Sequence, residues 1–325
     1  MRVHHAMLES LHLKSFAPAL LAACVAVFAC GVAAQTDTPK AGEEAATLRV
    51  CSDPNNMPLS NERGEGYENK IAEALARDLR KRVEYTFFPQ RMGFVRHTLR
   101  EQDPTTRQYK CDVIIGVPSG YELTATTKPY MHSTYALVFA SRADFNSLQN
   151  ADDLLKLPRE KLEKLRIGVF ARSPGADWLL RNGLLEHAAV YSNQSGDPAE
   201  TPALTIGRDL AAGNIDLAIV WGPIAGLLVR EHSGSATWNA VPFKPDPQIK
   251  FDYQIAMGVR FGEKEWKTTL DEWIDSRRDQ VQAILASYHV PLVDESGNVA
   301  ASFGPDAAQR GAVPKRIPLQ LGPER

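Results

Sequence analysis

The chain of 325 residues carries 37 basic and 39 acidic side chains, which give a formal net charge of −2 at pH 7. This balance argues against a protein that binds nucleic acid or adheres to an anionic membrane surface. The length exceeds one average domain and agrees with two folded lobes.

The first 34 residues are predicted to form a cleaved secretory signal peptide. Arg2 and Lys14 bracket the start, residues 16–30 are almost wholly apolar, and small residues up to Ala34 offer a cleavage site. The apolar run is too short for a membrane span. An uncleaved anchor and lipoprotein processing at Cys24 are the alternatives. We expect export to the periplasm and no membrane span in the mature chain.

Strands and helices alternate through the first part of the mature chain. Residues 35–46 are polar and are predicted to be a disordered leader. The next strand is marked by Leu48 and Val50, which alternate with a polar residue, and turn-forming residues then end it. The elements predicted after it are a helix over 69–81, a strand over 83–87, a short helix over 94–99 and a strand over 113–115.

A second alternation follows an apolar strand at 135–141 and a helical segment at 151–165, which Pro158 is expected to break. Strands are predicted at 166–170, 189–191, 215–220 and 253–260, with helices through 178–180, at 210–212 and from Lys264 onward. Strands separated by helices indicate βαβ units and a mostly parallel sheet. Residues 292–325 show no periodicity, and we expect an irregular C-terminal tail.

Cys51 and Cys111 are the cysteines that remain after signal cleavage, and one disulfide is the simple expectation for an exported protein. The predicted strands raise an objection. Cys51 lies late on one strand and Cys111 at the start of its parallel neighbour, a stagger of about three or four residues or roughly 10–13 Å. A disulfide needs Cα atoms within about 7 Å. Both states stay open, and the disulfide is favoured.

Four runs of sequence carry a resemblance to a known family. They are Arg49–Ser60, Pro89–Arg96, Cys111–Tyr121 and Ile215–Gly226. Together they resemble the MxaJ/XoxJ-like proteins, which are periplasmic binding-protein homologues associated with PQQ-dependent alcohol dehydrogenases. The resemblance covers about residues 47–291 and leaves the tail outside.

The resemblance implies an α/β protein with the two-lobed class II periplasmic binding-protein fold, each lobe a mostly parallel sheet flanked by helices. Two crossings, near 140 and near 250, then join the lobes. The expected division places lobe 1 at residues 47–141 plus 251–291 and lobe 2 at residues 142–250.

The resemblance also implies a function. We expect a non-catalytic periplasmic accessory protein, a monomer when free, that binds a PQQ-dependent methanol or related alcohol dehydrogenase and assists its activation. No cofactor of its own is expected. Two alternatives are a solute-binding protein of an ABC importer for a small polar ligand and, more remotely, a dehydratase-type enzyme.

Candidate binding residues lie where the strands of an open α/β sheet end, because such sheets keep their ligand crevice there. Asp53, Asn55 and Asn56 follow the first strand, with an Asx turn as the alternative role. The other candidates are Ser119, Tyr121 and Tyr130 on the opposite wall and Trp221 from lobe 2, with plain packing as its alternative. Arg91 is a candidate for a docking surface that meets an acidic partner; the alternative is a solvated helix face with one structural ion pair.

The two charged anchors of amino-acid-binding relatives are missing. The arginine position falls in Pro118–Thr127, which contains no Arg, and the position of the acidic residue holds Trp221. Captured charged ligands need paired opposite charges, so amino-acid capture is disfavoured. We expect the cleft to receive a segment of the dehydrogenase. Searches for a nucleophile elbow, a dinucleotide fingerprint and metal-ligand spacings find no match.

Overall fold

The computed structural model describes residues 46–145, 147–193, 200–232, 238–294 and 299. The predicted signal peptide, nearly all of the predicted leader and most of the predicted tail lie outside these residues.

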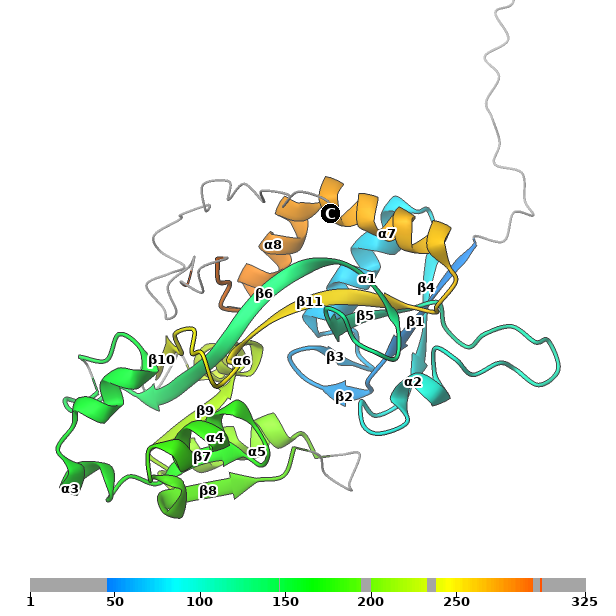
Figure 1. Cartoon of the computed structure of the whole chain (residues 1–325). Coiled ribbons are helices and arrows are strands. Elements are labelled where there is room, and N and C mark those ends of the chain that lie inside the picture. The colour runs from blue at the N-terminus through cyan, green and yellow to red at the C-terminus, as the bar shows by residue number, and fades with distance from the viewer. Residues whose placement is uncertain (1–45, 146, 194–199, 233–237, 295–298, 300–325) are drawn as a thin grey trace, which may run out of the picture. The chain divides into compact units, whose positions relative to one another are not determined.

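The sheet of lobe 1 has a parallel part and an antiparallel part (Figure 1). In the parallel part β1 (Thr47–Ser52) lies between β4 (Arg82–Phe87) and β5 (Val113–Pro118). In the antiparallel part β11 (Asp252–Val259) lies between β5 and β6 (Ala125–Ala140). A small hairpin, β2 (Asn55–Asn56) with β3 (Ser60–Asn61), follows β1.

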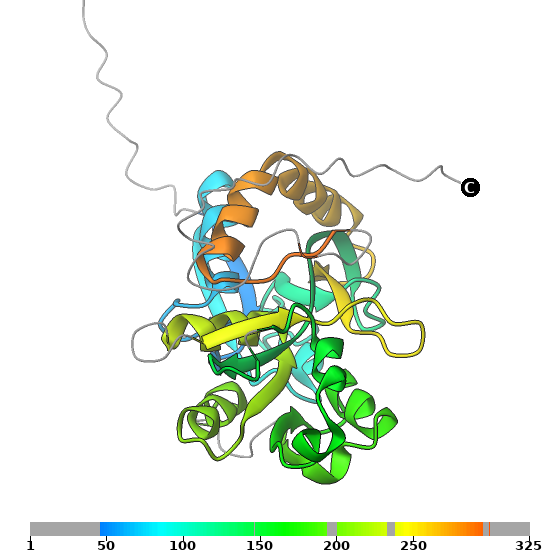
Figure 2. The same cartoon turned by 90° about the vertical axis from the view of Figure 1, so that its left-hand side faces the viewer.

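Helices cover both faces of this sheet. One face packs against α1 (Tyr67–Asp78), α7 (Lys264–Ser276) and α8 (Arg278–Ser287) through a shared apolar cluster. Figure 2 shows the cyan α1 and the orange α8 on the same side of the lobe. The other face carries the short helix α2 (Phe94–His97) over a separate cluster that contains both cysteines.

Lobe 2 contains the parallel strands β9 (Leu217–Trp221), β7 (Ile167–Phe170) and β8 (Ala188–Tyr191). One apolar cluster packs beneath η1 (Ala151–Lys156), α3 (Arg159–Leu162) and α4 (Pro174–Arg181), with η2 (Leu185–His187) beside it. A second cluster lies beneath α5 (Pro202–Ala211) and α6 (Gly222–Glu231).

The 16-residue strand β6 is common to both sheets. Its first part pairs with β11, while residues 135–140 pair with β9 and with β10 (Trp238–Pro242). The sequence predicted only the second part of this strand and missed β10. The lobe boundaries at 141 and 250 stay predictions.

Other elements agree closely with the sequence. The break at Pro158 is confirmed, because η1 ends before it and α3 begins after it. Helix α1, predicted over 69–81, instead runs from Tyr67 to Asp78. The reason is its cap: the Asn69 side-chain oxygen accepts the Gly66 N–H at 3.1 Å, which lets the helix begin directly after Gly66.

Candidate functional site

The polar segment after β1 is held by its own hydrogen bonds. Asp53 Oδ1 accepts the backbone N–H of Asn55 at 2.8 Å, which is an Asx turn, and Asp53 Oδ2 accepts the backbone N–H of Gln90. Asn56 Nδ2 donates to Gln90 Oε1 at 3.0 Å. The side chains of Asp53 and Asn56 therefore bind this segment to the loop after β4, as the Asx-turn alternative predicted for Asp53.

Asn55 makes a contact between the lobes. Thr201, the residue before α5, donates from its hydroxyl to Asn55 Oδ1 at 3.1 Å. The backbone N–H of Asn55 is already used by Asp53. Its side chain thus meets lobe 2 directly.

Glu68 is a buried acid that the sequence analysis missed. It lies in the first turn of α1 and is 6 % exposed. Its Oε1 lies close to Gly116: a Cβ atom added to Gly116 would lie only 2.1 Å from this oxygen. Within the described ranges this oxygen has no hydrogen-bond partner. Burial, with a smaller contribution from the charge of Asp53, raises the pKa of Glu68 to about 8. The acid is therefore mostly protonated at neutral pH.

Tyr130 belongs to the same electrostatic neighbourhood. Its hydroxyl is buried and lacks a hydrogen-bond partner in the part of the chain that the structure describes. Burial raises the pKa of Tyr130 well above its ordinary value, and the charges of Glu68 and Tyr67 add smaller contributions in the same direction. The predicted site residue Tyr130 is thus electrostatically coupled to Glu68, but the two groups are not hydrogen-bonded to each other in the described structure.

Trp221 ends β9 and packs between two tyrosines. Its ring centroid lies 5.5 Å from that of Tyr135 on β6 and 5.7 Å from that of Tyr253 on β11. It also packs against the main apolar cluster of lobe 1. These contacts are the packing role that the sequence analysis kept as the alternative to ligand stacking.

A groove of about 490 Å³ lies beside α2 and brings Arg91 and Tyr121 together. Buried Phe94, Val95 and Val117 are among its lining residues. Ser119 is not among them; it is exposed, and its backbone N–H bonds the carbonyl oxygen of Gln254. The described residues that line it are Gln90, Arg91, Met92, Gly93, Phe94, Val95, Arg96, Arg100, Gly116, Val117, Pro118, Tyr121 and Leu123.

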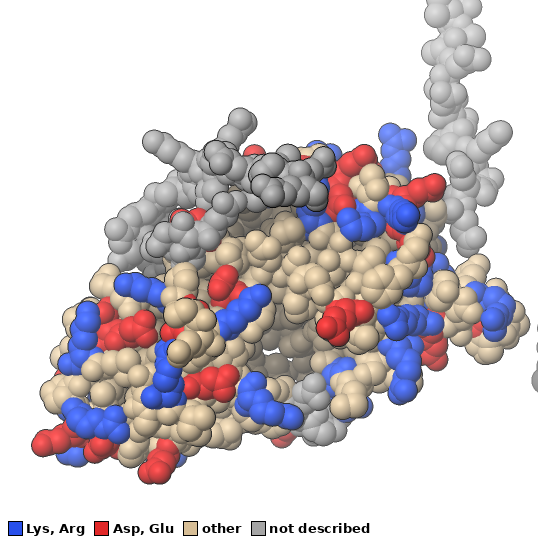
Figure 3. Space-filling model, viewed as in Figure 1, with Lys and Arg blue, Asp and Glu red and all other residues tan. Residues whose placement is uncertain are grey.

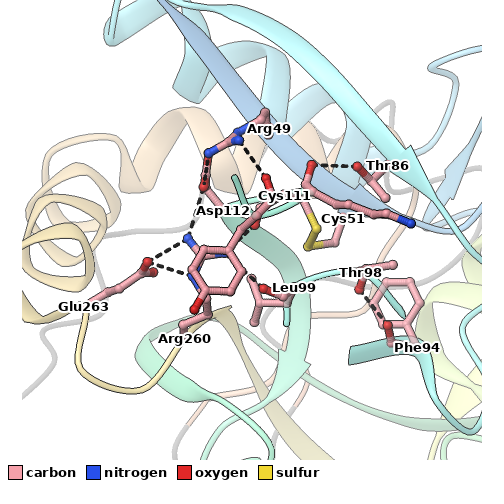
Figure 4. The surroundings of a disulfide bond; sticks show 12 residues. Arg49, Cys51, Thr86, Phe94, Thr98, Leu99, Cys111, Asp112, Arg260 and Glu263 are labelled. Atoms are coloured by element: carbon pink, nitrogen blue, oxygen red, sulfur yellow. Dashed lines mark hydrogen bonds and ion pairs between the residues drawn. A yellow bond between two sulfur atoms is a disulfide. The ribbon is translucent and has the colours of Figure 1, made fainter. Parts of the chain in front are cut away.

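A disulfide joins Cys51 to Cys111 with a Cα–Cα distance of 5.4 Å (Figure 4). The strand register pairs Cys51 with Ile114, so the predicted offset of three residues is present. The objection fails because Cys111 precedes β5, where the chain turns toward β1: the N–H of Asp112 bonds the carbonyl oxygen of Arg49. The 10–13 Å expectation holds only within a continuous strand.

Ion pairs stabilise the region around the disulfide. Asp112 pairs with Arg49 at 2.8 Å and with Arg260 at 3.1 Å, and Arg260 also pairs with Glu263 at 2.6 Å (Figure 4). Arg260 Nη1 donates to the carbonyl oxygen of Leu99, close after α2, at 3.0 Å. Disulfide and ion pairs thus fix the segments that flank the groove.

The described residues contain neither a metal-ion cluster nor a membrane-spanning helix. No group of three His, Cys, Asp or Glu side chains there is placed to hold a metal ion. No helix in those ranges is long and apolar enough to cross a membrane.

Comparison with known proteins decides the family, although no family model matches the chain. The crystal structure of the periplasmic binding protein XoxJ from Methylobacterium extorquens AM1 is 34% identical, with a TM-score of 0.61, and covers 76% of this chain and 100% of XoxJ. The chain belongs to the MoxJ/XoxJ family of periplasmic binding proteins. MoxJ of Paracoccus denitrificans is 26% identical over 277 residues, which are 82% of this chain and 96% of MoxJ. MoxJ of Methylorubrum extorquens AM1 is 29% identical over 304 residues, 86% and 95% of the two chains.

Membership in the MoxJ/XoxJ family confirms the two-lobed α/β binding-protein fold expected from the sequence, and it implies a periplasmic location. The site residues stay predictions. The sequence missed Glu68 and the groove as a unit. A carboxylate in the first turn of a helix that begins at the crevice was the available signal for Glu68, but the helix was predicted to start at residue 69.

Proposed function

We propose that this chain is a non-catalytic periplasmic accessory protein, exported by a cleaved signal peptide, that binds a PQQ-dependent methanol or related alcohol dehydrogenase and assists its activation. The observation that carries the proposal is its 34% identity over the whole of XoxJ, a member of a family associated with these enzymes.

The crevice supports binding of a protein better than capture of an amino acid. Asp53 and Asn56 are hydrogen-bonded within lobe 1, and Trp221 is packed between tyrosines. The segment Pro118–Thr127 offers no guanidinium for a carboxylate. A free amino acid would leave its charges unpaired in such a site.

Calorimetric titration of residues 35–325 with the quinoprotein dehydrogenase of the same cell, in apo and PQQ-loaded forms, tests this proposal. Tighter binding of the apo form is expected from an activation partner. Absence of binding to both forms would overturn the proposal.

A second candidate is a receptor for a small, uncharged, hydroxyl-bearing solute. The Tyr130 hydroxyl and Glu68 Oε1 favour it, because they have no hydrogen-bond partner in the described part of the chain and buried polar groups normally have one. Native mass spectrometry of protein purified from its own periplasm distinguishes the two, since a receptor would carry a bound small molecule and an accessory protein would not.

A further inference from the structure

The groove beside α2 is apolar within and basic at its rim. Phe94, Val95 and Val117 are buried, whereas Met92 is 95 % exposed and Leu123 is 44 % exposed. Methionine, arginine and aromatic side chains are enriched where proteins meet. The groove therefore offers one partner side chain an apolar pocket at a surface that is otherwise solvated.

Among the described residues, three arginines and no acidic residue line the groove. Arg91 lies over the ring of Phe88, Arg96 lies 3.0 Å from the ring nitrogen of His97, and Arg100 donates to the carbonyl oxygen of Leu123. Across the described residues none of these three guanidiniums forms an ion pair with a carboxylate.

Two acids next to this rim, Glu101 and Glu122, form no ion pair with the three arginines within the described residues. Glu101 pairs with Lys110 at 3.0 Å and lies 3.8 Å from His97. Glu122 is exposed and lies between the lining residues Tyr121 and Leu123 without lining the groove. On the face shown in Figure 3, Lys and Arg side chains gather over the region that Figure 1 labels α2.

Charge complementarity selects the occupant. Arginine stays protonated at every physiological pH. Three guanidiniums that form no ion pair within the described residues therefore match carboxylates that flank an apolar side chain. A second copy docked by the same face would set its three arginines against these three, which is repulsive. The braced disulfide corner holds the groove in shape before binding, which lowers the entropic cost of docking.

We propose that this groove docks an acidic segment of the dehydrogenase that carries one apolar anchor residue. The inference deepens the proposed function and rests on it. The anchor enters the groove past Met92 and Leu123, and the carboxylates beside it meet Arg91, Arg96 and Arg100.

Titration calorimetry with the apo-dehydrogenase, at about 50 and 300 mM salt, tests the inference. The double variant Arg91→Glu/Arg96→Glu is expected to bind at least about tenfold more weakly than wild type and with a flatter salt dependence. The control Arg208→Glu/Lys244→Glu makes the same charge change at exposed positions of lobe 2 and is expected to bind like wild type. Met92→Asp tests the entry of the partner's apolar anchor past Met92. The substitution is not expected to harm folding, because Met92 is so exposed.

The outcomes separate the two proposals. Absence of binding by wild type overturns both the proposed function and the groove. If Arg91→Glu/Arg96→Glu and Met92→Asp both bind the dehydrogenase with the affinity of wild type, the inference that the groove is the docking site is overturned, while the proposed function stands. Sedimentation that shows a wild-type dimer, abolished by Arg91→Glu/Arg96→Glu, would assign the groove to a second copy and also overturn the inference.

Discussion

The buried acid Glu68 makes the stability of the protein depend on pH in a defined direction. Burial, helped by the charge of Asp53, raises the pKa of its carboxyl from the ordinary 4.5 to about 8 in the folded state. The folded protein holds this proton more tightly than the unfolded chain, so stability is fully present below pH 4.5 and is lost as the pH rises through 8. At about 1.4 kcal/mol for each pKa unit, the complete loss is about 5 kcal/mol.

Guanidinium unfolding of wild type and Glu68→Gln at pH 5 and pH 8.5 measures this effect. Between these pH values wild type is expected to lose about 4 kcal/mol more than the variant, because the amide does not titrate. Glu73→Gln is the control: it lies on the same helix, and Glu73 is 40 % exposed and pairs with Lys70. Equal pH dependence in wild type and Glu68→Gln would refute the reasoning, whatever their absolute stabilities.

Three further predictions concern stability, each checked by guanidinium unfolding. Replacing Cys51 and Cys111 with serine is expected to lower the unfolding free energy by about 4 kcal/mol, because the disulfide closes a loop across a sequence separation of 60 residues; reduced wild type should match the variant. Gly226→Ala is expected to lose at least about 2 kcal/mol, since its Cβ would lie 2.4 Å from a carbonyl oxygen of the segment after α8. Leu75→Ala, at a fully buried position of α1, is expected to lose about 2–5 kcal/mol, whereas Leu180→Ala, 64 % exposed, should change stability by less than about 0.5 kcal/mol.

The elements that sequence periodicity predicted are those with regular burial. The strand predicted at 253–260 is β11, one residue earlier, because its apolar residues are packed between two neighbours. Strand β10 was missed, since five residues that end in a proline carry too little alternation. The start of α1 depended on the contacts of Asn69 with residues 61 and 66, which helical periodicity does not encode.

The candidate site could be predicted only in part from the sequence, because much of it depends on contacts between distant segments. The turn chemistry of Asp53 was recognisable because its hydrogen bonds are local. The groove combines residues 90–100 with residues 116–123, and strand pairing and the disulfide bring those segments together. The burial of Glu68 arises from contact with β5, so its raised pKa depends on tertiary structure.

Strand β6 has a consequence for how the chain can be divided. Because its 16 residues pair with β11 in one lobe and with β9 and β10 in the other, neither sheet is complete without its share of one uninterrupted strand. A fragment that ends within β6, where the chain passes from one lobe to the other, would expose a strand edge without its pairing neighbours and is expected to aggregate. The two lobes are therefore expected to fold and to be degraded as one unit. A chimera that exchanges one lobe between family members must include the whole of β6 from one parent.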